Sequence, residues 1–178
     1  NVPVAVRSSA TGEDSADASF AGIFDTYLGI SGAQATIEAV RAYLGEALPA
    51  DGEVLDLMSA WRSHLPHGYT GRVVGLGMNA VELAENPQLD DWLVHDLNAN
   101  PTMPFDDGRF DAAFVVVSVQ YMTRPLEIFA DVRRVLKPGA AFHVVFSDRM
   151  FFTKAVAIWR SLEPADKRAE LKIGRAHV

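Results

Sequence analysis

Five short runs of apolar residues recur through the middle of the chain, separated by helical or loop connections. Continuous apolar runs are typical of strands that are buried on both faces of a parallel sheet. Connections of a dozen or so residues suit the crossovers that parallel strands require. The pattern therefore predicts a parallel sheet with strands at residues 54–58, 73–76, 92–96, 112–118 and 141–147.

A helix is predicted between the fourth and fifth runs. Pro125 suits the first turn of a helix, where its missing N–H would have no partner, and the segment 137–139 (Lys-Pro-Gly) ends the helix. Its apolar residues recur at helical spacing and are expected in the core: Leu126, Phe129, Val132, Val135 and Leu136. Other helices are expected over residues 37–44, 79–86 and 155–162.

Composition narrows the class of protein. The 178 residues are 49% hydrophobic and 22% charged, which indicates a globular domain rather than a disordered chain. A net charge of -7 argues against a nucleic-acid partner bound by electrostatics. No apolar run reaches the roughly 18 residues of a membrane span. The absence of cysteine excludes disulfides and thiolate metal sites and is compatible with the cytoplasm, which we expect as the location.

Two stretches carry a resemblance to a known family. Residues 103–111 (MPFDDGRFD) resemble the segment that leads into the fourth strand of class I S-adenosylmethionine-dependent methyltransferases. Residues 129–139 (FADVRRVLKPG) are similar to the helix and turn before that family's fifth strand. The resemblance covers about residues 42–171. It implies an α/β fold with a Rossmann-like, doubly wound and mostly parallel sheet, truncated at the C-terminus, and S-adenosylmethionine as cofactor.

Polar residues follow the expected strands at their carboxyl ends, where ligands bind in open α/β sheets. In the family that the chain resembles, a close-approach loop follows the first strand, an acid for the ribose hydroxyls follows the second, and a polar group for the adenine follows the third. The resemblance places cofactor contacts at Asp56, Ser59, Trp61, Gly77, Asn79, Asp96, Leu97 and Ser118.

Two departures from the family pattern bear on cofactor affinity. Residues 58–61 (Met-Ser-Ala-Trp) replace the usual glycine-rich loop, so the backbone approaches a ligand less freely than glycine allows. The tryptophan of this segment either stacks on a ligand or fills the core. Gly77 stands where the acid is expected, with Asn79 or Glu82 as weaker substitutes. Asp96 is the strongest single candidate; the alternative is a strand-end carboxylate that caps a turn.

The first 40 residues carry a different resemblance. Residues 4–14 (VAVRSSATGED) and 18–28 (ASFAGIFDTYL) resemble the nucleotide-binding domain of phosphoenolpyruvate synthase and pyruvate phosphate dikinase. The family's arginine after the first strand corresponds to Arg7, which would hold nucleotide phosphates, as a guanidinium fork suits. An ATP site with Mg is thus an alternative for this segment, and a solvated surface residue is the alternative for Arg7.

These resemblances predict a composite chain. We expect a nucleotide-binding-domain fragment over residues 1–40, a methyltransferase-like domain over 41–171 and a scar over 172–178. The last seven residues match the peptide that one reading frame of a common sequencing adapter encodes, and such segments are left out of fold reasoning. The start at Asn1 rather than Met also suggests a fragment. A genuine gene fusion is the alternative.

Three functional hypotheses follow. The first is methyl transfer from S-adenosylmethionine to a small-molecule acceptor, with the catalytic residues left open. The second is a fragment of an ATP-dependent phosphotransferase (kinase) like phosphoenolpyruvate synthase, and the third is an inactive nucleoside-binding remnant. His64 and His67 have a metal-like spacing without an acidic or third imidazole partner nearby, so no metal site is expected. The sequence does not indicate the oligomeric state.

Overall fold

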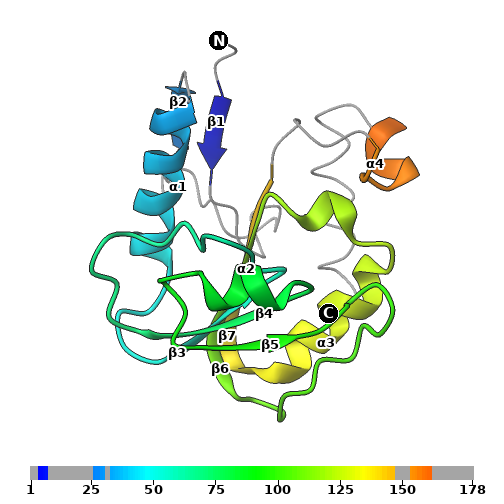
Figure 1. The fold of residues 1–178 in the computed structure, drawn as a ribbon. Helices are drawn as coiled ribbons and strands as arrows, with labels where there is room; N and C mark the ends of the chain where they lie inside the picture. Colours follow the sequence, from blue (N-terminus) through cyan, green and yellow to red (C-terminus); the bar gives the residue numbers. More distant parts are fainter. Residues whose placement is uncertain (1–3, 8–25, 31–32, 147–152, 162–178) are drawn as a thin grey trace, which may run out of the picture. The chain divides into compact units, whose positions relative to one another are not determined.

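The computed structural model describes residues 4–7, 26–30, 33–146 and 153–161 of the chain, which divides into two compact units (Figure 1). The first unit lies within residues 1–48 and 64–69. In it, β1 (Val4–Arg7) pairs antiparallel with β2 (Thr26–Ile30), and both contact α1 (Ala33–Ala47). The two described strands of the N-terminal segment therefore form a sheet of their own and are not part of the five-stranded sheet.

Helix α1 contains the expected helix at residues 37–44 and extends it at both ends. Its buried residues are Ala39, Val40 and Leu44, two of which are four residues apart and so lie on the same face. This amphipathic pattern gives the helix an apolar side for packing within its own unit.

The second unit, residues 49–63 and 70–178, holds a five-stranded sheet in the order β5-β4-β3-β6-β7. All four strand pairs are parallel. The strands are β3 (Glu53–Leu57), β4 (Arg72–Gly77), β5 (Asp91–Val94), β6 (Phe110–Val116) and β7 (Leu136–Val145). The predicted parallel α/β sheet is thus confirmed, although Ser147 of the expected last strand lies outside the described residues.

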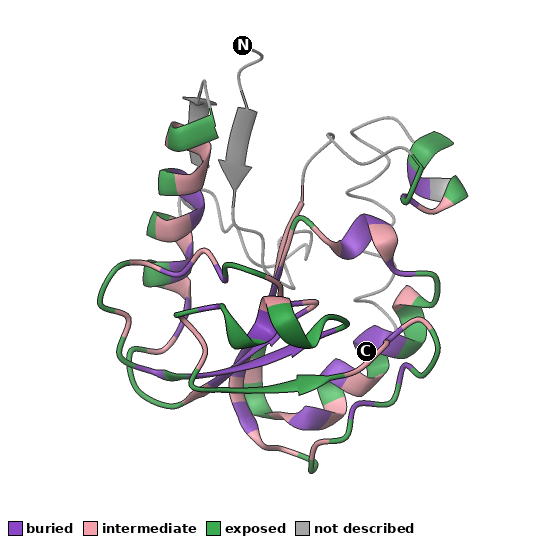
Figure 2. Cartoon of the chain, viewed as in Figure 1, coloured by how far each residue is buried: buried purple, intermediate pink, exposed green. Residues whose placement is uncertain are grey.

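The central strands are the most buried part of this sheet (Figure 2). Strand β3 lies between β4 and β6, and four of its five residues are buried. Phe110 and Phe114 of β6 are fully buried, and Phe110 packs edge-on against Phe105 with ring centroids 5.0 Å apart. Such burial of large apolar side chains is the main stabilising contribution to a sheet of this kind.

Helix α3 (Pro125–Val135) packs against β7 and begins where the sequence predicts, but β7 starts at once with the half-buried Leu136 and includes residues 137–139, which were expected as a turn. Phe129, Val132 and Val135 are buried as expected, and Phe129 packs edge-on against Phe142 of β7 at 5.3 Å. The expectation was wrong for Leu126, which is 54% exposed. It lies in the first turn, on the side of the helix away from the apolar stripe.

Strand β5 also differs from the prediction. All four of its residues, Asp91 to Val94, are exposed rather than buried on both faces (Figure 2). The physical reason is its position at the edge of the sheet, with β4 on one side, while the short helix α2 (Ala80–Ala84) packs against it. An apolar run therefore indicated the strand but not its burial.

The C-terminal part of the described chain holds α4 (Ala157–Ser161), which falls within the helix expected over residues 155–162. Trp159 is buried, and its ring packs edge-on against Phe146 with centroids 5.8 Å apart. Leu162 and the proposed scar at 172–178 lie outside the described residues.

Candidate functional site

The parallel strands bring their carboxyl ends to one edge of the sheet, and the predicted cofactor contacts of the methyltransferase-like unit lie in or just after these strands. Asp56 lies inside β3, and Ser59 and Trp61 follow that strand. Gly77 ends β4, Asp96 and Leu97 follow β5, and Ser118 follows β6. We call this side the carboxyl edge. Open α/β sheets bind their ligands outside it.

Asp56 is the most unusual titratable group at this edge. Its carboxylate is buried because β3 pairs it with Gly75 on one side and Phe114 on the other. Burial raises the pKa of Asp56 from its ordinary 3.8 to about 6, although hydrogen bonds from Ser59 and Ser63 oppose the rise. The Oγ of Ser59 donates to Oδ2 of Asp56 over 2.6 Å.

A buried polar network continues from Asp56 through the loop after β3. Asn86 is buried, and its Nδ2 donates to Oγ of Ser63 over 3.0 Å and to the carbonyl of Ala60 over 2.8 Å. Satisfied networks of this kind fix a loop in one conformation. The network therefore orders the segment that replaces the glycine-rich loop. Ser63 and Asn86 were missed by the sequence analysis, since neither follows a strand directly.

Gly77 is fixed by its packing. A Cβ at this position would stand 2.2 Å from the carbonyl oxygen of Ser59, and the N–H of Ser59 donates to the carbonyl of Leu76 over 2.9 Å. The loop after β3 therefore lies directly on the end of β4. Because no side chain fits here, the acid expected at this position is excluded by the close approach of the two backbones.

Asn79 and Asp96 both cap turns in the structure. Oδ1 of Asn79 accepts from the N–H groups of Val81 and Glu82, which makes it the N-cap of α2. Oδ1 of Asp96 accepts from the N–H groups of Asn98 and Ala99 over 2.9 and 3.3 Å. Asp96 also lies beyond β5, so the premise that it ends a buried strand was wrong. Both capping bonds go to Oδ1, so among the described residues Oδ2 of Asp96 is available to accept from a ligand.

The remaining predicted contacts differ in exposure. Trp61 is 51% exposed, so it does not fill the core, and this favours the stacking alternative. Leu97 is only 4% exposed and belongs to the apolar core. The Oγ of Ser118 donates to the carbonyl of Val116 over 3.0 Å. Arg7 is the last residue of β1, and its side chain lies outside what the structure describes.

Asn98 joins two loops of the carboxyl edge that are far apart in the sequence. Its Nδ2 donates to the carbonyl of Tyr121 over 3.0 Å, and its Oδ1 accepts from the N–H and hydroxyl of Thr123. The loop after β5 is thus bonded to the loop after β6. The sequence analysis did not select Asn98, although it directly follows Asp96 and Leu97, two of the predicted contacts.

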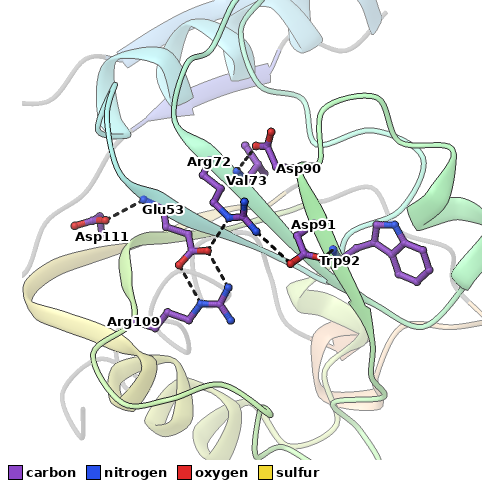
Figure 3. A network of polar contacts seen from close by, with 8 residues as sticks. All are labelled: Glu53, Arg72, Val73, Asp90, Asp91, Trp92, Arg109 and Asp111. Atoms are coloured by element: carbon purple, nitrogen blue, oxygen red, sulfur yellow. Dashed lines mark hydrogen bonds and ion pairs between the residues drawn. The ribbon is translucent and has the colours of Figure 1, made fainter.

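The opposite, amino edge of the sheet carries a ladder of alternating charges (Figure 3). Glu53 at the start of β3 accepts from Arg109 over 2.8 and 2.9 Å and from Arg72 over 3.0 Å. Arg72 also pairs with Asp91 at the start of β5 over 3.2 Å. The contacts with Arg109 and then Arg72 lower the pKa of Glu53. These pairs connect the starts of the strands, at the edge away from the candidate site.

Comparison with known proteins identifies the parts of the chain. Residues 58–144 match the model of a methyltransferase domain family, and residues 1–52 match that of the pyruvate phosphate dikinase AMP/ATP-binding domain. The part of the chain from the loop after β3 into β7 is thus similar to a methyltransferase domain. It follows a segment that is similar to the dikinase domain.

One curated relative and two solved structures show how far the similarity extends. The chain is 34% identical to the methyltransferase phqN of Penicillium fellutanum over 83 residues, 43% of this chain and 26% of that protein. A SAM-dependent methyltransferase from Aquifex aeolicus has a TM-score of 0.55, 18% identity and 78% coverage of both chains. The [4+2]-cyclase SpnF has a TM-score of 0.59 and 20% identity, covering 79% of this chain and 58% of its own.

These similarities have clear bounds. The chain spans about a quarter or less of the length of the curated relatives it matches. At identities of 17–20%, structures of this kind show the fold of the methyltransferase domain alone. Among the described residues, no three His, Cys, Asp or Glu side chains gather into a potential metal site, and no helix is long and apolar enough to span a membrane.

Proposed function

We propose that the methyltransferase domain transfers a methyl group from S-adenosylmethionine to a small-molecule acceptor. The observation that carries the proposal is the coincidence of the family match over residues 58–144 with polar groups that follow β3, β5 and β6 at one edge of a parallel sheet. The bound cofactor would supply an activated methyl group on a positively charged sulfur. The domain must then hold the cofactor, align the acceptor and exclude water.

The donor set of the carboxyl edge fits such a cofactor. Oδ2 of Asp96 can accept from a hydroxyl, and the exposed ring of Trp61 offers a stacking surface. With a pKa of about 6, Asp56 is largely ionised at neutral pH and contributes negative charge beneath the loop after β3. Negative charge at this edge favours a cationic ligand over a polyphosphate. These residues, together with Ser118 after β6, would hold the cofactor.

Methylation activity can be tested on the full chain. The purified protein is incubated with S-adenosylmethionine and a mixture of small nucleophilic acceptors, and release of S-adenosylhomocysteine is followed. Product formation above the rate without acceptor supports methyl transfer. Binding of S-adenosylhomocysteine without any turnover would favour the inactive remnant instead.

A second function has a specific observation in its favour. Residues 1–52 match an AMP/ATP-binding domain, and Arg7 lies in that segment. We propose ATP with Mg as the ligand of this segment in the enzyme family from which it derives. Binding of ATP by the full chain that Arg7→Ala abolishes would support this assignment. Binding that the substitution leaves unchanged would contradict the role of Arg7.

A further inference from the structure

Val117 combines a strained backbone with an exposed apolar side chain. It lies directly after β6 at the carboxyl edge, its φ is 50°, and it is 38% exposed. A β-branched residue at positive φ is an outlier, because its two branches crowd the backbone in the left-handed region. Asparagine or glycine would adopt this conformation more easily. The valine therefore makes this turn less stable than it could be.

The strained conformation is held from both sides. The N–H of Val117 donates to the carbonyl of Val145 over 2.7 Å, and its carbonyl accepts from Nε2 of Gln120 over 2.9 Å. The side chain of Gln120 is fully buried, so its amide is fixed in place. The surrounding structure thus determines the turn and presents the side chain of Val117 outward. Strain of this kind persists where neighbouring contacts over-determine it.

Met58, after the neighbouring strand β3, also has a positive φ but differs from Val117 in the packing of its side chain. It follows β3 with a φ of 60°, but its side chain packs partly buried against the core. That packing offsets the strain at Met58. Among the described contacts, the side chain of Val117 has no comparable place in the core cluster.

Other exposed apolar side chains accompany Val117 at the same edge. Trp61 follows β3, and Met78 and Val81 follow β4, with exposed fractions of 51%, 63% and 63%. The charged ladder of Glu53, by contrast, lies at the opposite edge of the sheet. An apolar surface beside a few polar groups is what binding sites for small organic molecules generally offer.

We infer that Val117 is a specificity-determining residue that contacts the methyl acceptor, and that this acceptor has an apolar body carrying one nucleophilic group. The inference rests on the proposed methyltransferase function. A role in acceptor binding explains why a strained valine occupies a turn that asparagine would stabilise. The valine lowers the stability of the turn but provides apolar contact with a ligand.

Three variants of the full chain test this role. Val117→Asn relieves the strain and removes the apolar surface, Val117→Ile keeps both, and Leu126→Asn alters an exposed apolar residue on α3. We expect Val117→Asn to raise the midpoint of thermal unfolding by about 2–4 °C. Val117→Ile should give no such gain. A lower midpoint for Val117→Asn would show that the valine is structural and would overturn the inference.

Ligand binding supplies the second readout, with calorimetry of S-adenosylhomocysteine and of para-octylphenol, an apolar molecule with one hydroxyl. We expect Val117→Asn to weaken para-octylphenol binding about tenfold, measured with saturating S-adenosylhomocysteine, while Val117→Ile and Leu126→Asn stay within about twofold of the unsubstituted protein. Binding of S-adenosylhomocysteine itself should be unchanged in all three variants.

The possible failures are distinguishable. If the unsubstituted protein binds no S-adenosylhomocysteine, the proposed function fails and the inference fails with it. If it binds S-adenosylhomocysteine but not para-octylphenol, or if Val117→Asn binds the phenol as well as the unsubstituted protein does, only the inference is overturned. Equal losses for both ligands would make Val117 a cofactor contact and overturn its assignment to the acceptor.

Discussion

The carbonyl oxygen of Ser59 lies 2.2 Å from the point where a Cβ on residue 77 would stand, so Gly77 and the loop after β3 pack backbone against backbone. Real Cβ atoms do not approach backbone oxygens this closely. The loop after β3 and the end of β4 are also joined by the hydrogen bond from the N–H of Ser59 to the carbonyl of Leu76, which would break if they moved apart. A glycine is therefore required at the end of β4. The loop that lacks the family's glycines depends on this glycine from the neighbouring strand.

Gly77→Ala should destabilise the domain by about 3 kcal/mol or more, because the added methyl group forces two backbones apart. Gly75→Ala is the matched control in the same strand. There the new Cβ would meet Cδ1 of Leu89 at 2.5 Å, the end of a flexible side chain, and about 1 kcal/mol is expected. Urea denaturation of the two variants gives the comparison. Equal losses would contradict the close packing of Ser59 on Gly77.

The buried carboxyl of Asp56 makes stability depend on pH. Its pKa of about 6 in the folded protein lies above the ordinary 3.8, so the folded state binds more protons between these values. The stabilisation is complete below about pH 4 and is lost as pH rises through 6. The difference of about 2 between the two pKa values corresponds to roughly 3 kcal/mol.

Asp56→Asn should remove this dependence, because the amide oxygen still accepts from Ser59 but does not ionise. Measured by denaturation, the variant should gain stability over the unsubstituted protein as pH rises from about 4 to 7. A constant difference between the two proteins over this range would show that Asp56 titrates normally.

The sequence predicted the sheet well because apolar strand runs and helix-ending residues are local signals. The run at residues 54–58 and the segment 137–139 each placed an element boundary to within a few residues. Burial was harder to predict: Trp92 and Leu93 belong to an apolar run but are exposed on β5, which lies at the edge of the sheet. Strand order is a long-range property that no local pattern contains.

The residues expected at the candidate site follow the strands as predicted, whereas the hydrogen bonds among them were not predicted. The carboxyl ends of the strands indicated Asp56, Asp96 and Ser118, but Ser63 lies further along the loop after β3 and Asn86 follows α2, so no strand end indicated either partner. The glycine at position 77 looked like a missing acid. Only the position of the Ser59 backbone reveals why no side chain fits there.

Asp96 caps the turn that follows it and is also a predicted ligand contact. The substitution Asp96→Asn separates these two roles. The asparagine keeps an oxygen for the N–H groups of Asn98 and Ala99, so stability should change by less than about 0.5 kcal/mol. Loss of the charged acceptor should weaken S-adenosylhomocysteine binding roughly tenfold or more. Asp106→Asn, in an exposed turn, is the control and should bind normally. Equal dissociation constants of S-adenosylhomocysteine for the two variants would show that Asp96 only caps the turn.

The charge ladder at the amino edge should contribute to stability without affecting ligand binding. Glu53→Gln removes the charged acceptor of Arg72 and Arg109 and should cost about 1–2 kcal/mol, less at high salt. Because the pKa of Glu53 is lowered, its contribution to the free energy of unfolding is present above its ordinary pKa and is lost as the pH falls. Glu127→Gln, in an exposed pair with Arg124, should leave stability nearly unchanged. Denaturation at low and high salt gives both values. A cost for Glu53→Gln that salt does not reduce would contradict the electrostatic account.

The central claim is that the methyltransferase domain has retained its cofactor site. Isothermal titration calorimetry of the full chain with S-adenosylhomocysteine, and separately with ATP and Mg, tests it most directly. We predict binding of S-adenosylhomocysteine that Asp96→Asn weakens and Arg7→Ala leaves unchanged. Binding of ATP alone, or of neither ligand by a folded protein, would contradict the methyltransferase account.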